Sequence, residues 1–125
     1  MIKSSYVYIP VTDLEEAAGW YENNLGFKVR YKDALYYDMR TDNDVKIMLI
    51  ANENGINSQM KYSSGFQPAY GFCVSDFDVI RKKLVDNGVK LGKIFDYFGR
   101  SCSFFDLDDN KIEIWEDYDY NKLKP

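Results

Sequence analysis

The first periodic segment of the chain alternates aliphatic and aromatic residues. In residues 6–11, three aliphatic side chains alternate with Tyr6 and Tyr8, which predicts a strand with an aliphatic face and a tyrosine face. Apolar residues then recur at helical spacing from Leu14 to Leu25. Thr12, three residues before a glutamate, is in the position of a capping box, and we expect it to start this helix. Three further strands are predicted, at residues 27–31, 35–39 and 45–51.

The same order of elements returns after a polar segment. Residues 52–68 are rich in Asn, Ser, Gly and Gln, and we predict a linker there. Beyond it, residues 74–78 superpose on residues 11–15, which indicates a repeat. The second copy predicts a strand, a helix that stops at Asn87-Gly88, and three more strands at about 91–97, 100–106 and 111–116.

A module of one helix and four strands covers only one face of its sheet, so two modules gain stability by pairing. We therefore expect an α+β fold of two tandem βαβββ modules, whose curved mixed sheets surround a concave cavity with the helices outside. The pairing can occur within one chain or by exchange between two chains. The expected organisation is a single domain of residues 1–125: module one at about 4–51, the linker at 52–68, module two at about 69–117 and an acidic tail at 118–125.

Composition excludes several functions. The 125 residues include no histidine, which removes Ser-His-Asp and Cys-His nucleophiles and histidine metal sites. A net charge of -4 without a basic block argues against nucleic acid and anionic membranes as partners. Cys73 and Cys102 do not form a CxxC pair, and we expect both to be reduced, buried thiols of a cytoplasmic protein.

Two segments carry a family resemblance. Residues 9–27 contain the strand, the capped helix and the ending Trp-Tyr-Glu-Asn-Asn-Leu-Gly-Phe, and residues 104–114 contain Phe-Phe-Asp-Leu-Asp-Asp-Asn-Lys-Ile-Glu-Ile. With the repeat, they resemble the vicinal oxygen chelate superfamily, which includes glyoxalases, bleomycin-resistance proteins and extradiol dioxygenases. The resemblance covers nearly the whole chain. It implies the fold given above and a homodimer.

Members of that family that are enzymes hold a divalent metal at four strand positions, which match Tyr6, Met48, Ala69 and Glu113 here. Only Glu113 is an ordinary metal ligand, since a thioether and a methyl group cannot replace imidazole or carboxylate. We therefore expect a member of the family that lacks the usual metal ligands and has no metal or other cofactor. Extradiol cleavage is excluded.

Strand alternation predicts which side chains face the cavity. If Ile112 and Ile114 are core residues, then Glu113 and Trp115 point the opposite way. The same reasoning places further predicted ligand-binding residues toward the cavity: Tyr6, Tyr8, Met48 and Ala69. Arg100 is a candidate for binding an acidic ligand group, or else a surface residue at the start of a strand.

For Glu113, two interpretations remain: a carboxylate that binds a ligand or acts as a catalytic base, or a solvated or salt-bridged side chain. The leading functional hypothesis is a metal-free protein that binds a small molecule, such as a cationic aromatic compound or antibiotic, as bleomycin-resistance proteins do. The first alternative is a glyoxalase-like lyase or isomerase that uses Glu113 as a base or weak metal ligand. The second is a non-catalytic interaction module.

Overall fold

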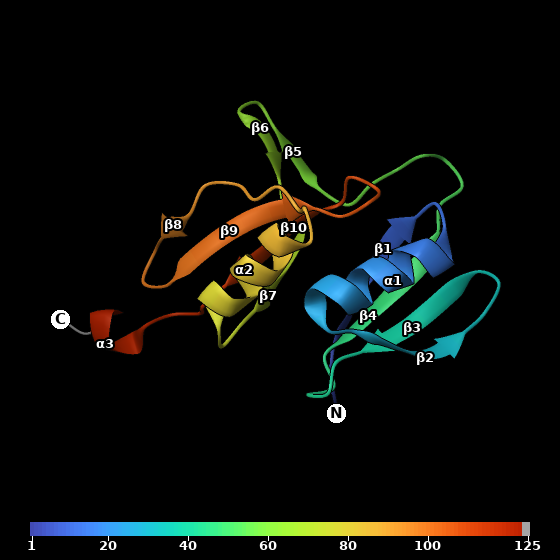
Figure 1. The fold of residues 1–125 in the computed structure, drawn as a ribbon, viewed down its shortest axis with the longest axis horizontal. Coiled ribbons are helices and arrows are strands. Elements are labelled where there is room, and N and C mark those ends of the chain that lie inside the picture. The colour runs from blue at the N-terminus through green and yellow to red at the C-terminus, as the bar shows by residue number, and fades with distance from the viewer. Residues whose placement is uncertain (124–125) are drawn as a thin grey trace. The chain divides into compact units, whose positions relative to one another are not determined.

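The computed structural model describes residues 1–123, which divide into two compact units (Figure 1). The first unit comprises residues 1–58 together with residues 106–110, and the second comprises residues 59–105 and 111–123. Each unit contains one four-stranded mixed sheet and one long helix. The predicted α+β class and the two βαβββ modules are therefore confirmed.

In the first unit, strands and helix follow one another as the sequence predicts. Its elements are β1 (Tyr6–Val11), α1 (Leu14–Leu25), β2 (Lys28–Lys32), β3 (Tyr36–Arg40) and β4 (Lys46–Ala51). The strand order is β1-β4-β3-β2, with β1 parallel to β4 and the other neighbours antiparallel.

Both ends of α1 have an identifiable cap. The helix begins one residue later than the predicted capping box, because Asp13 and not Thr12 is the N-cap and accepts a hydrogen bond from the backbone N–H of Glu16. Gly26 ends the helix in the left-handed conformation, with φ 75°.

The aliphatic face of the first sheet forms the core with α1. Ile9, Val11, Ile47 and Leu49 are fully buried there. Because side chains alternate along a strand, the intervening residues of β1 and β4 lie on the opposite face, which contains Tyr6 and Tyr8. We call this second surface the tyrosine face.

The second unit repeats the arrangement with two differences from the prediction. Its sheet has the order β7-β10-β9-β8, with β10 parallel to β7 and antiparallel to β9. The elements are β7 (Tyr70–Cys73), α2 (Phe77–Asp86), β8 (Phe95–Asp96), β9 (Arg100–Phe105), β10 (Lys111–Trp115) and α3 (Tyr120–Leu123). The strand predicted at 91–97 is shortened to two residues. The predicted linker contains a hairpin of β5 (Met60–Tyr62) and β6 (Gly65–Gln67).

Ile112 and Ile114 are fully buried, together with Phe77, Leu84 and Phe104, so the predicted core of this unit is confirmed. Cys102 is also buried, but Cys73 is exposed, so the prediction of two buried thiols is wrong for Cys73. Cys73 belongs to the sheet face that alternates away from the core, and this position explains its exposure.

The acidic segment 106–110 forms the turn between β9 and β10 and packs within the first unit. Asp106 is buried and accepts hydrogen bonds from the Tyr21 hydroxyl (2.6 Å) and from the Asn110 side chain (2.9 Å). Burial raises the pKa of the Asp106 carboxyl, while the hydrogen bond from Tyr21 is the largest opposing effect. Within residues 1–123, no helix is both long and apolar enough to span a membrane.

Candidate functional site

Glu113 lies at the middle of β10, on the sheet face opposite the buried isoleucines. The register pairs it with Gly71 of β7 on one side and Ser103 of β9 on the other. Directly paired residues point to the same face, so the Glu113 carboxylate has a small neighbour on each adjacent strand. The next pair of positions along β10 brings in Trp115 and Cys73. We call this surface the Glu113 face.

Position 71 requires a glycine because the backbones of β7 and β10 approach each other closely there. A Cβ at this position would lie 2.7 Å from the carbonyl oxygen of Glu113 and 3.1 Å from its Cβ. The first of these distances is shorter than real Cβ contacts. The absence of a side chain here therefore fits β7 against β10 and also leaves space beside the Glu113 side chain.

Within its own unit, among residues 59–105 and 111–123, the partly exposed Glu113 carboxylate forms no ion pair and no hydrogen bond. Lys111 and Arg100, two cations of the same unit, form no salt bridge with it. Lys111 donates instead to the carbonyl oxygen of Phe66, and Arg30 is near Asp44. The carboxylate is thus available for a ligand.

Trp115 provides an aromatic surface next to Glu113. Its ring packs edge-on against Tyr118, with centroids 4.6 Å apart and an interplanar angle of 83°. Both side chains keep some exposure to solvent. The pKa of the nearby Cys73 thiol is raised, mainly because the thiol is partly buried. The negative charges of Asp117 and Glu113 raise this pKa further.

On the tyrosine face of the first sheet, Tyr6 and Tyr8 are both exposed, and their rings meet edge-on at 5.4 Å. A side-chain hydrogen bond to Tyr6 is the largest cause of the raised pKa of Tyr8, so the Tyr8 hydroxyl stays protonated. Met48 pairs with Tyr8 across β1 and β4 and is nearly buried.

The four positions that the family resemblance assigns to a metal have a poor donor set. Tyr6 and Met48 lie on the tyrosine face, Ala69 is exposed just before β7, and Glu113 alone offers a carboxylate. The Lys46 ammonium lies 5.3 Å from the centre of the Tyr6 ring and would repel a divalent cation there. Within residues 1–123, no cluster of His, Cys, Asp and Glu suited to metal binding is found. The residues at these positions do not fit the family's metal.

Arg100 lies on the helix side of the second sheet, where two carboxylates bind its guanidinium. Asp78 accepts from both terminal nitrogens at 3.0 and 3.2 Å, and Glu116 accepts from Nη2 at 2.7 Å. The guanidinium carbon also lies 4.9 Å from the centre of the Phe77 ring. These contacts, led by the hydrogen bond to Glu116, raise the pKa of Arg100. The structure thus places Arg100 in an internal ionic cluster and not beside Glu113.

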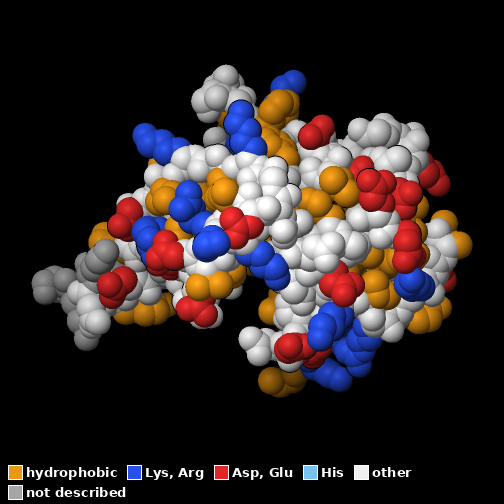
Figure 2. Space-filling model, in the orientation of Figure 1, with side chains coloured by type: hydrophobic (Ala, Val, Ile, Leu, Met, Phe, Trp, Pro, Cys, Tyr) orange, Lys and Arg blue, Asp and Glu red, His pale blue; other side chains and the backbone are white. Residues whose placement is uncertain are grey.

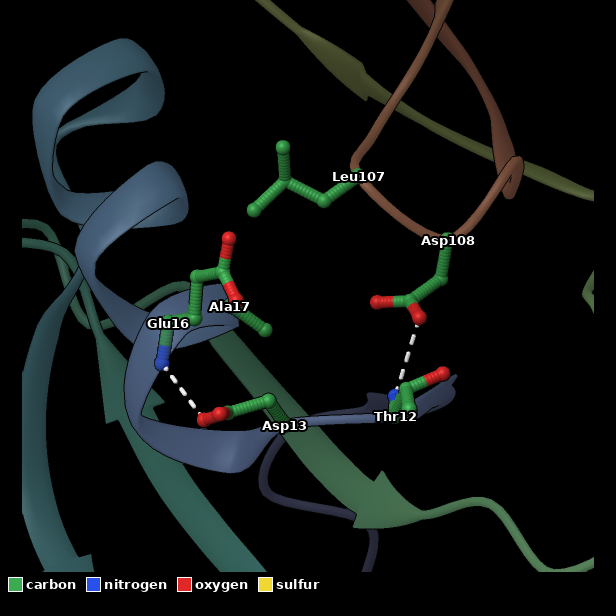
Figure 3. Close-up of a pocket in the computed structure, with 6 residues that line it drawn as sticks. All are labelled: Thr12, Asp13, Glu16, Ala17, Leu107 and Asp108. Atoms are coloured by element: carbon green, nitrogen blue, oxygen red, sulfur yellow. Dashed lines mark hydrogen bonds between the residues drawn. The ribbon is translucent and has the colours of Figure 1, made fainter.

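The structure also contains a surface pocket in each unit. The one in Figure 3, of about 280 Å³, is lined by Thr12, Asp13, Glu16, Ala17, Leu107 and Asp108. Asp108 accepts a hydrogen bond from the backbone N–H of Thr12 (2.9 Å), and Asp13 caps α1, so two of the three carboxylates hold backbone groups. The other pocket, of about 310 Å³, is formed by Val74, Ser75, Gly99, Glu116, Asp117, Tyr118 and Asp119.

The sequence did not single out the ionic groups of the tyrosine face. Asp38, Arg40 and Lys46 lie there in adjacent positions of β3 and β4. Lys46 is two residues before Met48, so strand alternation could have placed it. Asp38 and Arg40 could be placed on this face only from the register of β3 against β4. Charges of both signs are also interspersed over the face of the molecule that Figure 2 shows.

Comparison with known proteins agrees with the fold and the repeat. The model of the Glyoxalase/Bleomycin resistance protein/Dioxygenase superfamily matches residues 3–114, and the chain belongs to this superfamily. Among curated proteins, no sequence matches this chain.

Several solved structures share the fold at low sequence identity. Oxidase ChaP-H2 is 20% identical, with a TM-score of 0.74 over 94% of this chain and 96% of the other. The fosfomycin resistance protein FosX from Listeria monocytogenes is 17% identical, with a TM-score of 0.73 over 100% of both chains. An integron cassette protein from the mobile metagenome of Halifax Harbour is 19% identical, with a TM-score of 0.72 over 92% of this chain and 98% of the other.

Proposed function

We propose that the protein binds a cationic aromatic small molecule, such as an antibiotic, on the Glu113 face, and sequesters it without a metal. The observation on which this rests is the Glu113 carboxylate, which lacks a partner within its own unit, among residues 59–105 and 111–123, and has Gly71 and Ser103 as cross-strand neighbours. A carboxylate left without a partner favours a ligand that brings a positive charge and hydrogen-bond donors.

Aromatic and electrostatic features support the same ligand class. Trp115 offers a ring next to the carboxylate, and an aromatic face attracts a cation as well as a planar ring. Glu113 and Asp117 make the surroundings of the Cys73 thiol negative. Arg100 is not part of the proposed site, because its guanidinium is bound by Asp78 and Glu116.

Calorimetric titration with two matched probes tests the proposal. Proflavine is a planar aromatic cation and acridone is an uncharged ring of similar shape, so the pair separates charge from stacking. In a Trp20→Phe background, Trp115 is the single tryptophan and reports the same binding by fluorescence. We expect proflavine to bind and quench Trp115, and acridone to bind at least ten-fold more weakly.

Two single-residue variants test whether Glu113 is the residue that binds proflavine. Glu113→Gln keeps the size of the side chain and removes its charge, and we expect about a ten-fold loss of proflavine affinity. Glu53→Gln removes one exposed carboxylate elsewhere and serves as the control. Equal affinities of wild type and Glu113→Gln for proflavine, or equal affinities of wild type for both probes, would contradict the proposal.

A second candidate is a lyase or isomerase in which Glu113 acts as a base. The free carboxylate favours it, because a base needs an unblocked oxygen next to the substrate. Turnover of a glyoxalase-type or epoxide substrate that Glu113→Gln abolishes would favour this enzyme over a binding protein. Native mass spectrometry of protein purified without chelators tests the proposed homodimer and detects any metal or co-purified ligand.

A further inference from the structure

The positions beside Glu113 on the second sheet are occupied by small residues. Gly71 and Ser103 are its direct cross-strand neighbours. Beyond Ser103 the chain passes at Gly92, whose backbone N–H donates to the Ser103 carbonyl oxygen at 2.7 Å. A Cβ at position 92 would lie only 3.1 Å from Ser103 Oγ. Glu113 is thus the longest side chain of its row, and the row leaves room for a ligand group beside the carboxylate.

The neighbouring row of the same face has two aromatic side chains with a serine between them. The register pairs Trp115 of β10 with Ser101 of β9, and Ser101 with Phe95 of β8. Directly paired residues point to the same face, so Phe95 belongs to the Glu113 face, and 62% of its surface is exposed. A small residue thus separates two large aromatic ones.

The spacing of this row suits one ligand ring. Neighbouring strands lie about 4.8 Å apart, so the backbones at Trp115 and Phe95 are separated by roughly 10 Å across β9. A ligand ring above Ser101 would be about 5 Å from either residue, within the range of about 4.5 to 7 Å for aromatic contacts. The indole of Trp115 is fixed by Tyr118, at 4.6 Å between ring centres, and by the close backbone of Gly99.

Charged side chains decide which part of a ligand lies in this row. The Lys93 ammonium lies 5.8 Å from the centre of the Phe95 ring, so the positive charge of a ligand is disfavoured there. The Glu113 carboxylate attracts that charge. Because Glu113 is paired with Ser103, it is diagonal to Ser101, at roughly 7 to 8 Å. The cation and the ring of a fitting ligand are therefore separated by about this distance.

The row on the other side of Glu113 is less suited to a ligand ring. There Lys111 of β10 is paired with Phe105 of β9, and its ammonium lies 5.6 Å from the centre of the Phe105 ring. The ammonium also donates to the carbonyl oxygen of Phe66 at 2.7 Å, which holds it in place. A lysine occupies the position that corresponds to Trp115, so this row offers neither a second ring nor a charge that attracts a cationic ligand.

We propose that Phe95 determines the ligand specificity of the Glu113 face, and that the ligand is an arylalkylamine, in which a flexible chain separates the ammonium from the ring. The ammonium binds Glu113, and the ring lies above Ser101 between Trp115 and Phe95. This inference rests on the proposed function and narrows its ligand class to cations whose charge and ring are apart.

Isothermal titration with 3-phenylpropylamine and benzylamine tests the inference. Both probes have the same ammonium and the same ring, but the longer chain alone spans the diagonal from Glu113 to Ser101. We expect 3-phenylpropylamine to bind about five-fold more tightly than benzylamine or better. Phe95→Ala should weaken 3-phenylpropylamine by about three-fold or more, whereas Phe95→Tyr, which keeps the ring, should retain the affinity.

Phe105→Ala is the matched control, because Phe105 is also an exposed phenylalanine of this face with a lysine ammonium near its ring. We expect it to change the affinity for 3-phenylpropylamine by less than about two-fold. Equal losses in Phe95→Ala and Phe105→Ala would overturn the inference. Equal affinities of the wild type for the two amines, or no binding of either, would also overturn it.

Glu113→Gln separates this inference from the proposed function. The variant should weaken both amines, because the ammonium of each binds the carboxylate. If it does so while Phe95→Ala has no effect, the inference fails and the proposed function stands. If Glu113→Gln leaves both affinities unchanged, the proposed function fails as well.

Discussion

The hydrogen bond between Tyr21 and Asp106 allows a quantitative test of how the turn at residues 106–110 is held. Tyr21 is fully buried and its hydroxyl donates to the buried Asp106 carboxyl at 2.6 Å. Tyr21→Phe removes this donor and leaves the ring in place. A hydrogen bond to a charged group contributes about 1.5 to 3 kcal/mol to stability, so we expect a loss of about 2 kcal/mol.

Chemical and thermal unfolding measure this loss. For 125 residues the entropy of unfolding is about 0.26 kcal/mol/K, so a loss of about 2 kcal/mol lowers Tm by roughly 8 °C. Urea titration followed by circular dichroism gives the free energy of unfolding independently.

The chain contains a matched control for this experiment. Tyr37 donates to Glu15 at the same 2.6 Å, but Glu15 is largely exposed, and water replaces the lost bond there. We expect Tyr37→Phe to change stability far less than Tyr21→Phe. Equal effects of the two variants would contradict this expectation, because the two hydrogen bonds differ mainly in burial.

Two further predictions concern pH and packing. Because burial raises the pKa of Asp106 above its unfolded value, its contribution to stability is greatest at low pH and is lost as the pH rises through the raised pKa. Asp106→Asn should therefore flatten this part of the pH profile of unfolding. Gly71→Ala should cost about 1 to 3 kcal/mol in urea unfolding because its Cβ meets the Glu113 backbone. Gly19→Ala, where a Cβ meets nothing within 4 Å, should stabilise α1, and the same sign for both glycines would contradict this account.

Residue spacing along the chain was enough to predict most helices and strands and the face on which their side chains lie. A two-residue period separates the buried Ile112 and Ile114 from Glu113 and Trp115 without knowledge of any neighbour, because alternation is a property of the strand backbone. For the same reason, the repeat and the glycine that ends α1 were predictable from local residue spacing.

Which side chains meet across the fold could not be read from these local patterns. The alignment of Lys28, Arg40 and Lys46 depends on the register of β2, β3 and β4, and no local pattern fixes that register. The ion pairs of Arg100 with Asp78 and Glu116 join residues that are 22 and 16 positions apart. Tyr21 and Asp106 are 85 positions apart. Such contacts arise from long-range packing, whereas the sequence pattern reports only the periodicity of each segment.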